Sequence, residues 1–239
     1  MAVEKQNLQQ IQEAHAELYD SEAVLFDDIS LHEDTSGKLR RFLLDRFSFD
    51  GKSVLEAGAG AGRITDYYVD RAKRVVATDA YESMVGMLKQ KYALVDKVTA
   101  ELCDHRQLRS RFPESFDVFL SAFSFNYAFD PSVGDYDAFL EQILPPAGQH
   151  IIIECCGFYE EFDYLPPESV RYVRALEKRF QKAVIPTEFV FSSPEQAVAA
   201  AKVLFSPIAE RVRQQNRAVI PEMIHVYYDG CLISDARGF

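Results

Sequence analysis

Short apolar runs alternate along most of the chain with segments whose apolar residues recur at helical spacing. The first run lies at 53–57, and the segment 63–72 that follows it has the periodicity of a helix. Further runs predict strands at 74–78, 97–102, 116–120 and 149–155, and further periodic segments predict helices at 82–91 and 136–144. Apolar strands that alternate with helices are typical of a parallel sheet covered on both faces. The pattern therefore predicts a doubly wound α/β fold.

Both ends of the chain extend this core. Before it, the apolar positions predict one helix over 8–19 and another over 37–47, with a polar segment between them. After it, the pattern predicts in chain order a helix at 168–182, a strand at 187–191, helices at 194–205 and 207–216, and a strand at 223–232. We expect the last two strands to form an antiparallel pair at one side of the sheet.

A glycine-rich turn follows the first strand. Gly58, Gly60 and Gly62 stand at every second position of the stretch VLEAGAGAGR. Glycine permits backbone angles that a Cβ forbids and lets a ligand approach the main chain, while the helix that follows offers free N–H groups. The dinucleotide fingerprint G-x-G-x-x-G would place its third glycine at Arg63 or Thr65, so neither frame fits.

Acidic residues follow the next two strands. Asp79 ends the strand expected at 74–78, about twenty residues beyond the turn, which is the spacing that one helix and one strand require. A carboxylate there accepts hydrogen bonds from both hydroxyls of a ribose. Asp104 follows the strand after that. With the glycine turn, Asp79 indicates an adenosine-containing ligand; the alternative is a cap for the helix at 82–91.

The pattern E-x-G-x-G-x-G resembles the first motif of the class I S-adenosylmethionine-dependent methyltransferases. The resemblance covers about residues 37–233 and implies a seven-stranded mixed sheet in the order 3-2-1-4-5-7-6. It also implies an N-terminal helical lid over residues 1–36, with the methyltransferase domain at 37–239; the alternative is a surface helix with a polar linker. The turn LPPAG resembles the one that precedes strand five in this family, although Ala147 stands where glycine is usual.

The same resemblance assigns residues to the cofactor, S-adenosyl-L-methionine. Asp79 is expected to bind the ribose and Asp104 the adenine amino group. The residues expected to contact the cofactor are Glu56, Gly58, Ala59, Gly60, Gly62, Asp79, Ala80, Cys103, Asp104, His105, Ser121 and Tyr19. No metal ion is expected, because the four cysteines lack the paired spacing of a zinc site.

The chemistry expected of such a site is modest. The cofactor brings an activated methyl group, so the protein has mainly to align the acceptor and exclude water. A base is needed only where the acceptor must lose a proton. The residues expected as candidates for catalysis are Glu154, Tyr127 and His32. His15 lies on the apolar stripe of its helix, so we expect it to pack rather than react.

Aromatic residues are dense in two loops, after the fourth strand and after the fifth. They are Phe123, Phe125, Tyr127 and Phe129 in the first loop, and Phe158, Tyr159, Phe162 and Tyr164 in the second. Core packing accounts for part of this set, and the remainder predicts a flat, apolar pocket for a small molecule. These residues do not separate O-methylation from N-methylation.

Composition restricts the partners. The chain has 239 residues and a formal net charge of −11, which opposes broad contact with nucleic acid or an anionic membrane. The loop that ends in Asn126 and Tyr127 lacks the prolines typical of methyltransferases that act on nucleic-acid bases. The chain has no run of about 18 apolar residues, and its N-terminus lacks the apolar core of a signal peptide. We therefore expect a cytoplasmic protein.

These observations predict an enzyme that transfers a methyl group from S-adenosylmethionine to an oxygen or nitrogen of a small, aromatic or apolar organic molecule. One alternative is a protein or peptide methyltransferase, and another is a non-catalytic partner subunit that binds the cofactor. The glycine turn, Asp79 and Asp104 favour a functional cofactor site. Whether the chain forms a homo-oligomer is left open.

Overall fold

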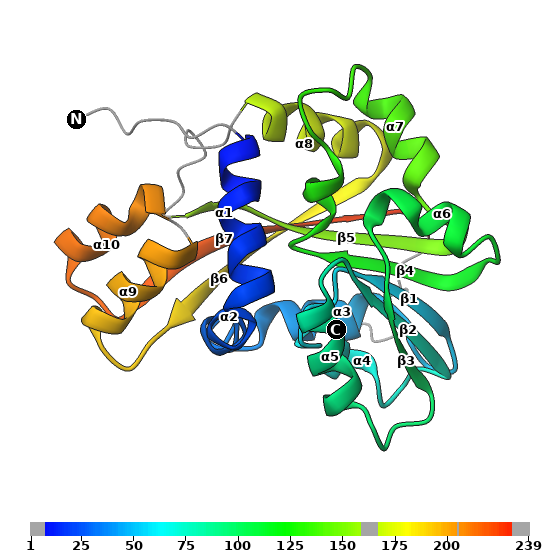
Figure 1. Ribbon diagram of the computed structural model, residues 1–239, viewed down its shortest axis with the longest axis horizontal. Helices are drawn as coiled ribbons and strands as arrows, with labels where there is room; N and C mark the ends of the chain where they lie inside the picture. The colour runs from blue at the N-terminus through cyan, green and yellow to red at the C-terminus, as the bar shows by residue number, and fades with distance from the viewer. Residues whose placement is uncertain (1–7, 159–166, 205, 231–239) are drawn as a thin grey trace, which may run out of the picture.

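The computed structural model describes residues 8–158, 167–204 and 206–230 and contains one seven-stranded sheet (Figure 1). The strands are β1 (Ser53–Ala57), β2 (Arg74–Asp79), β3 (Val98–Leu102), β4 (Phe116–Ala122), β5 (Ala147–Phe158), β6 (Gln181–Val190) and β7 (Val219–Tyr228). Their order is β3-β2-β1-β4-β5-β7-β6, with β1 to β5 parallel and β7 antiparallel to both of its neighbours. The predicted fold class and strand order are confirmed.

Helices cover both faces of the sheet. One face carries α3 (Lys38–Arg46), α4 (Thr65–Tyr68) and α5 (Glu82–Lys91), and the other carries α6 (Leu108–Arg111), α7 (Tyr136–Ile143) and α8 (Pro167–Arg179). Successive strand residues point to opposite faces. Val54 therefore packs in the first apolar cluster and Leu55 in the second. Burial on both faces explains why the strands read as nearly continuous apolar runs.

A third apolar cluster lies past the carboxyl ends of the shorter strands. It joins α1 (Leu8–Ser21), α2 (Ala23–Ser30), α9 (Pro194–Leu204) and α10 (Ala209–Gln215). Leu18 and Ile29 from the N-terminal helices meet Phe158 and Phe189 from the ends of β5 and β6 there. β4 ends at Ala122, whereas β5 continues to Phe158. The longer strands β5 to β7 thus carry a platform beside the carboxyl edge. In Figure 1, α1 lies between the α9–α10 pair and α7–α8.

Several elements differ from the sequence prediction. The last strand, β7, begins at Val219 rather than at 223, and the short helix α6 was not predicted. The polar segment between the first two predicted helices forms α2, because Ala23 and Ile29 are buried. The helix expected at 63–72 is reduced to the single turn α4. β6 begins at Gln181 rather than at 187, because its backbone pairs with β7 over ten residues, whatever its side-chain pattern.

Gly86 offers a test of the helix at 82–91. It lies exposed in the middle of α5, and an added Cβ would meet nothing within 4 Å. Gly86→Ala should raise the free energy of unfolding by ~1 kcal/mol, because alanine loses less backbone entropy than glycine in a helix. Urea denaturation measures this change. A lower stability in the variant would contradict a helix at this position.

Candidate active site

The glycine-rich turn leaves β1 at the centre of the carboxyl edge. Gly58 and Gly62 have φ angles of +67° and +87°, in the left-handed region that favours glycine. A Cβ on Gly58 would lie 2.0 Å from Ser124 Oγ, and a Cβ on Gly62 would lie 2.9 Å from the ring of Tyr92. Both the backbone angles and the lack of space therefore require glycine at these two positions.

Asp79 joins this turn to the end of β2. Its Oδ2 accepts the Gly60 N–H at 2.9 Å, and its Oδ1 accepts the Tyr81 N–H at 3.0 Å. The Ala59 N–H also donates to the Thr78 carbonyl at 2.9 Å. Burial raises the pKa of Asp79, and the N–H groups of Gly60 and Tyr81 oppose that shift. Because a carboxylate has about four acceptor positions, Asp79 retains capacity for the hydroxyls of a ribose.

The next strand ends beside this carboxyl group. The Cys103 N–H donates to the Asp79 carbonyl at 2.9 Å. Asp104 caps a short 3-10 helix, η1 (His105–Gln107), by accepting the Arg106 N–H at 2.8 Å. Cys103 is buried, Asp104 is half-buried and Ala80 is exposed. Asp79 and Asp104 thus lie on adjacent strands at one edge, where a nucleoside can meet both.

Two serines connect the ends of β1 and β4 beside Gly58. Ser121 and Ser124 donate to the Ala57 carbonyl at 3.0 and 3.1 Å, and His105 Nε2 lies 3.2 Å from Ser124 Oγ. Burial lowers the pKa of His105 to about 4, so its imidazole is neutral near pH 7. These contacts show how Ser121 and His105 hold the turn in place.

Glu56 supports the turn from beneath. Its Oε2 accepts the hydroxyls of Thr65 at 2.5 Å and Tyr68 at 2.6 Å, and its side chain is buried. Burial raises the pKa of Glu56 to about 7, against the two hydroxyl donors. The carboxyl group therefore joins β1 to α4 and acts on the turn by fixing the helix after it.

The N-terminal helices bring aromatic rings to this edge. The ring of Tyr19, from α1, lies 4.7 Å from that of Phe26, 5.5 Å from Tyr81 and 5.9 Å from Tyr127. The Ser83 hydroxyl donates to the Tyr19 carbonyl at 2.6 Å. Because Tyr81 and Ser83 directly follow the end of β2, α1 is docked beside the predicted ribose site.

A second set of contacts holds the same segment over the glycine turn. Phe26 in α2 lies 4.0 Å from where a Cβ on Gly60 would be. Farther along, Glu33 accepts Arg63 Nη2 at 2.8 Å in a buried ion pair, and the Arg63 guanidinium lies 5.2 Å from the centre of the Phe123 ring. The segment predicted as a lid is therefore packed against the site in this structure.

The candidates for catalysis lie in different places. Glu154 is buried and accepts the Tyr172 hydroxyl at 2.8 Å. Burial raises the pKa of Glu154 to about 8, so it is protonated near pH 7 and poorly suited to act as a base. His32 Nδ1 lies 2.8 Å from the Val190 carbonyl, and its ring packs on Phe191. These contacts hold His32 against β6.

Tyr127 has a partner that the sequence prediction missed. Its hydroxyl lies 3.1 Å from the Tyr19 hydroxyl and 2.5 Å from His15 Nδ1. His15 Nε2 in turn lies 3.3 Å from the Leu204 carbonyl. His15 is half-buried, and both of its ring nitrogens have polar partners, which its place on the apolar stripe of the helix did not predict. The four-residue spacing of His15 and Tyr19, which puts both on one helix face, was the available signal.

The predicted aromatic pocket is only partly present. Phe125, Phe129 and Phe158 are buried in the apolar clusters, whereas Phe123 and Tyr127 are half-buried. The remaining three predicted aromatic residues, Tyr159, Phe162 and Tyr164, lie outside the described residues. The rings around Tyr19 replace part of the predicted set, and they come from the N-terminal helices.

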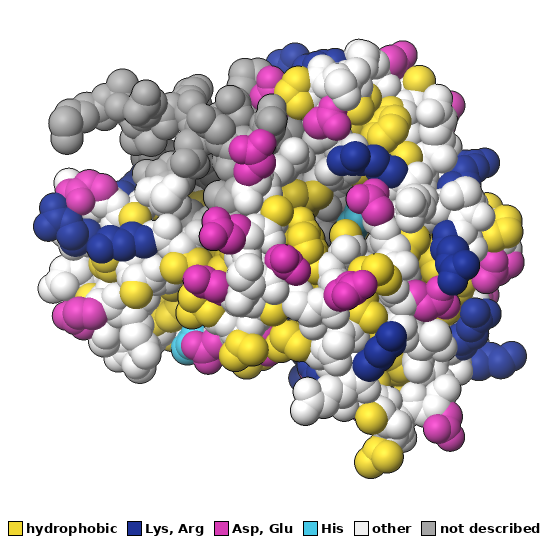
Figure 2. Space-filling model, in the orientation of Figure 1, with side chains coloured by type: hydrophobic (Ala, Val, Ile, Leu, Met, Phe, Trp, Pro, Cys, Tyr) yellow, Lys and Arg dark blue, Asp and Glu magenta, His cyan; other side chains and the backbone are white. Residues whose placement is uncertain are grey.

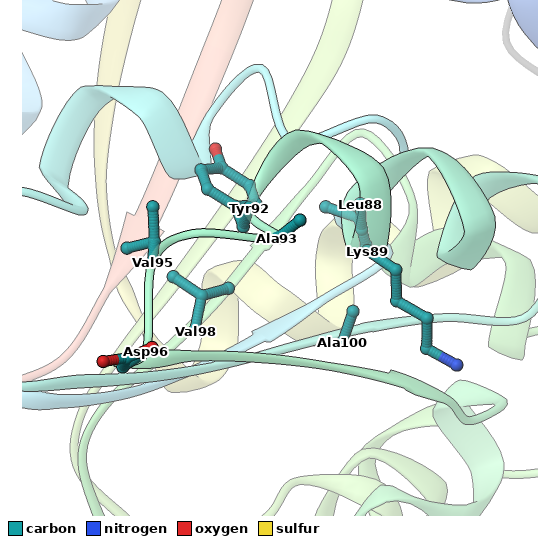
Figure 3. A pocket seen from close by; sticks show the side chains of 8 residues that line it. All are labelled: Leu88, Lys89, Tyr92, Ala93, Val95, Asp96, Val98 and Ala100. Atoms are coloured by element: carbon teal, nitrogen blue, oxygen red, sulfur yellow. The ribbon is translucent and has the colours of Figure 1, made fainter.

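A separate pocket of about 200 Å³ lies between α5 and β3 (Figure 3). Leu88, Val95 and Val98 line it, with Lys89 and Asp96 alongside. Its lining comes only from residues between 88 and 100 and includes no part of the glycine turn. The pocket is therefore distinct from the site at the carboxyl edge.

Among residues 8–158, 167–204 and 206–230, no helix has both the length and the apolar character needed to cross a bilayer. Nor do these residues bring three or more His, Cys, Asp or Glu side chains into an arrangement that could hold a metal ion.

Comparisons with known proteins agree with this geometry. Residues 54–148 match a family model described as a methyltransferase domain. The DhpI–SAH complex is similar in structure, with a TM-score of 0.53 and 15% identity over 90% of this chain and 96% of the other. A candidate methyltransferase, BH2331 of Bacillus halodurans C-125, is similar with a TM-score of 0.51 and 13% identity, over 81% of this chain and 97% of the other. A protein of unknown function from Deinococcus radiodurans R1 is similar with a TM-score of 0.50 and 13% identity, over 80% of this chain and 85% of the other. No curated protein matches the sequence.

The matched segment contains the glycine turn, Asp79 and Asp104. Residues 54–148 therefore form a methyltransferase domain, and the strand order is that of the class I S-adenosylmethionine-dependent methyltransferase fold. The chain is thus a methyltransferase, and S-adenosyl-L-methionine is the cofactor of its domain. The spare acceptor capacity of Asp79 beside Gly60 fits the ribose of this cofactor.

Gly58→Ala tests the geometry of the turn. The added methyl would meet Ser124 Oγ and push the turn away from β4. We expect the affinity for S-adenosylhomocysteine to fall at least tenfold, or ~1.4 kcal/mol, by calorimetry. Gly86→Ala is the matched control and should keep wild-type affinity, because its Cβ points into open space. Unchanged binding by the Gly58 variant would contradict the placement of the ligand at this turn.

The buried carboxyl groups predict how stability depends on pH. Burial raises the pKa of Glu56 to about 7 and of Glu154 to about 8, from 4.5. The folded protein therefore holds these protons more tightly than the unfolded chain does. Their contribution to stability is full below pH ~4.5 and is lost as the pH rises through ~7 to ~8.

Glu154→Gln tests this dependence by removing one of the titrating groups. The melting temperature of the variant should fall less than that of the wild type between pH ~5 and ~8.5, because an amide does not ionise. Glu141→Gln alters an exposed carboxyl group and should keep the wild-type slope. If the melting temperature fell equally with pH in the wild type and both variants, a titrating Glu154 would be ruled out.

Proposed function

We propose that this enzyme transfers the methyl group of S-adenosylmethionine to an oxygen or nitrogen atom of a small, aromatic or otherwise apolar organic molecule. The observation that supports this most directly is the packing of the N-terminal helices over the carboxyl edge. α1 and α2 pack over it, and the rings of Tyr19, Phe26, Tyr81 and Tyr127 gather beneath them. An aromatic site covered in this way favours a small acceptor over a polymer.

The residues present divide the work of binding and alignment. When bound, the cofactor supplies a methyl group already activated for transfer. Asp79 would hold its ribose and Asp104 its adenine amino group, with the main chain at Gly60 close to the ligand. The aromatic rings would orient the acceptor and exclude water, and orientation of this kind can contribute on the order of 7–11 kcal/mol to lowering the barrier.

The surface of the N-terminal helices argues against a nucleic-acid acceptor. Figure 2 shows acidic side chains scattered over the face that α1 occupies in Figure 1. The exposed acidic residues of α1 and α2 and of the junction between them are Glu13, Glu17, Asp20, Glu22 and Asp28. With a net charge of −11, this surface would repel phosphate groups. A peptide acceptor would need an open groove where α1 instead contacts Tyr81 and Ser83.

Calorimetry with S-adenosylmethionine, S-adenosylhomocysteine and NAD tests the proposal first. We expect micromolar binding of both adenosyl ligands and none of NAD. Asp79→Ala should weaken binding by roughly a hundredfold, because hydrogen bonds to a charged group are worth about 1.5–3 kcal/mol each. Asp117→Ala, at the opposite edge of the sheet beside Ser53, is the matched control.

The outcomes separate the alternatives. Binding followed by turnover of a small acceptor would support the proposal. Binding without turnover across a broad screen of small acceptors and peptides would favour a non-catalytic, cofactor-binding subunit. Absence of binding by either adenosyl ligand would overturn the proposed reaction.

A further inference from the structure

Three side chains form a hydrogen-bonded chain whose direction can be worked out. The Leu204 carbonyl can only accept, so His15 Nε2 carries the ring proton and Nδ1 is left as an acceptor. The Tyr127 hydroxyl must then donate to Nδ1, and its oxygen accepts the proton of the Tyr19 hydroxyl. The Tyr19 oxygen, at the end of the chain, retains a lone pair for a ligand.

This free end lies at the carboxyl edge. The Tyr19 ring contacts Phe26, which lies beside Gly60, and Tyr81, which follows Asp79 by two positions. Burial raises the pKa of Tyr19, and the nearby Asp79 carboxylate raises it further. His15 lies at the other end of the chain, on the next turn of α1 toward the N-terminus.

Packing alone does not explain the chain. Phenylalanine would fill the positions of Tyr19 and Tyr127 equally well if only apolar contact were needed, and it would spare the cost of burying two hydroxyls. Two hydroxyl groups aligned from the cofactor edge to an imidazole instead form a path for a proton. Histidine is the side chain best suited to accept one near neutral pH.

We propose that Tyr19, Tyr127 and His15 carry a proton away from the methyl acceptor, and that the acceptor is therefore a phenol-type hydroxyl compound. This inference rests on the proposed function and narrows its substrate class. Tyr19 would contact the acceptor, while Tyr127 and His15 are positioning residues that act through it. The aromatic rings around the site suit the ring of a phenol, and the hydroxyls of Tyr19 and Tyr127 suit its O–H group.

The step is balanced in atoms and charge. The acceptor O–H bond breaks as a new bond forms between that oxygen and the methyl carbon, and the carbon–sulfur bond breaks with its electron pair going to sulfur. One proton moves from the acceptor to Tyr19, one from Tyr19 to Tyr127, and one from Tyr127 to His15 Nδ1. The positive charge lost from sulfur reappears on the imidazole, so the site keeps its net charge.

A phenol fits this chain better than other acceptors do. Its hydroxyl has an ordinary pKa of about 10, like that of free tyrosine. Burial raises the pKa of Tyr19 and Tyr127, so these hydroxyls pass the proton along to His15 and do not themselves hold a negative charge. The other titratable groups that face Tyr19 and Tyr127 are Asp79, Tyr81 and Glu154. Asp79 is bonded to backbone N–H groups, and Glu154 holds its own proton near pH 7. Burial lowers the pKa of His15, although its bond to Leu204 opposes the shift, so His15 is neutral near pH 7 and free to accept.

Two phenols test the proposal with the full-length protein and S-adenosylmethionine. The probes are 4-methylphenol, whose hydroxyl resembles that of tyrosine, and 4-nitrophenol, which is largely ionised in mildly alkaline buffer. Release of S-adenosylhomocysteine reports turnover. His15→Gln and Tyr127→Phe should lower the rate of 4-methylphenol methylation by ~100-fold, the usual scale of general-base catalysis. The same variants should change the rate of 4-nitrophenol methylation by less than about threefold. Tyr136→Phe, which also removes one hydroxyl, is the control, because its bond goes to the Asp130 carbonyl.

The pH profile gives a readout that a packing role would not produce. The relay works only while His15 is unprotonated, so the wild-type kcat/KM for 4-methylphenol should rise with pH through a pKa below 6.5. In His15→Gln this rise of kcat/KM with pH should be absent, whereas Tyr136→Phe should retain it.

Several results would overturn the relay. An equal fall in the methylation rates of both phenols would assign Tyr19, Tyr127 and His15 a structural role. Binding of S-adenosylhomocysteine without turnover of either phenol would refute the relay while leaving the broader function standing. Failure to bind S-adenosylhomocysteine would instead refute the proposed function. If a variant fails to fold, nitrogen NMR of the wild type still decides, because a proton on His15 Nδ1 at neutral pH would reverse the direction of the chain.

Discussion

The close approach of β4 to the glycine turn is the constraint on which the rest of the site depends. Ser124 occupies the space that a side chain at position 58 would need, and with Ser121 it bonds the carbonyl at the end of β1. This contact fixes the turn at one side, and the bond from the Gly60 N–H to Asp79 fixes it at the other. The main chain between them is held open to a ligand, and every other candidate contact is arranged around it.

The acceptor side of the site is built by strands of unequal length. β5, β6 and β7 continue past the ends of β1 and β4 and carry the apolar cluster that holds α1, α2, α9 and α10. The N-terminal helices can therefore lie over the carboxyl edge while still burying apolar surface, which is the dominant stabilising contribution. Through this arrangement, the Leu204 carbonyl at the end of α9 fixes the orientation of the His15 ring in α1, whose other nitrogen contacts Tyr127.

Buried charge fastens the same segment to the sheet. Glu33 pairs with Arg63 directly after the glycine turn, and Glu222 lies close by, accepting the Thr187 hydroxyl at 2.9 Å. Burial raises the pKa of Glu33 to about 7 and that of Glu222 well above its ordinary value. One guanidinium faces two carboxyl groups, so a retained proton on one of them keeps the cluster near neutrality. A buried pair of this kind adds little net stability, because the cost of removing both charges from water offsets their attraction.

The family resemblance of the E-x-G-x-G-x-G motif supplied the strand order. The sequence by itself determined the parallel sheet, the glycine turn and Asp79. These depend on local patterns: apolar runs of strand length, glycines where the backbone needs positive φ, and an acid at a fixed distance along the chain. Only the tertiary structure decided that 23–30 forms a helix, that β6 begins at Gln181, and that His15 meets Tyr127. Each of these depends on a partner far away in the chain. Pairing with β7 extends β6, and the docking of α1 against α9 and η2 (Phe125–Ala128) brings together side chains that no local spacing relates.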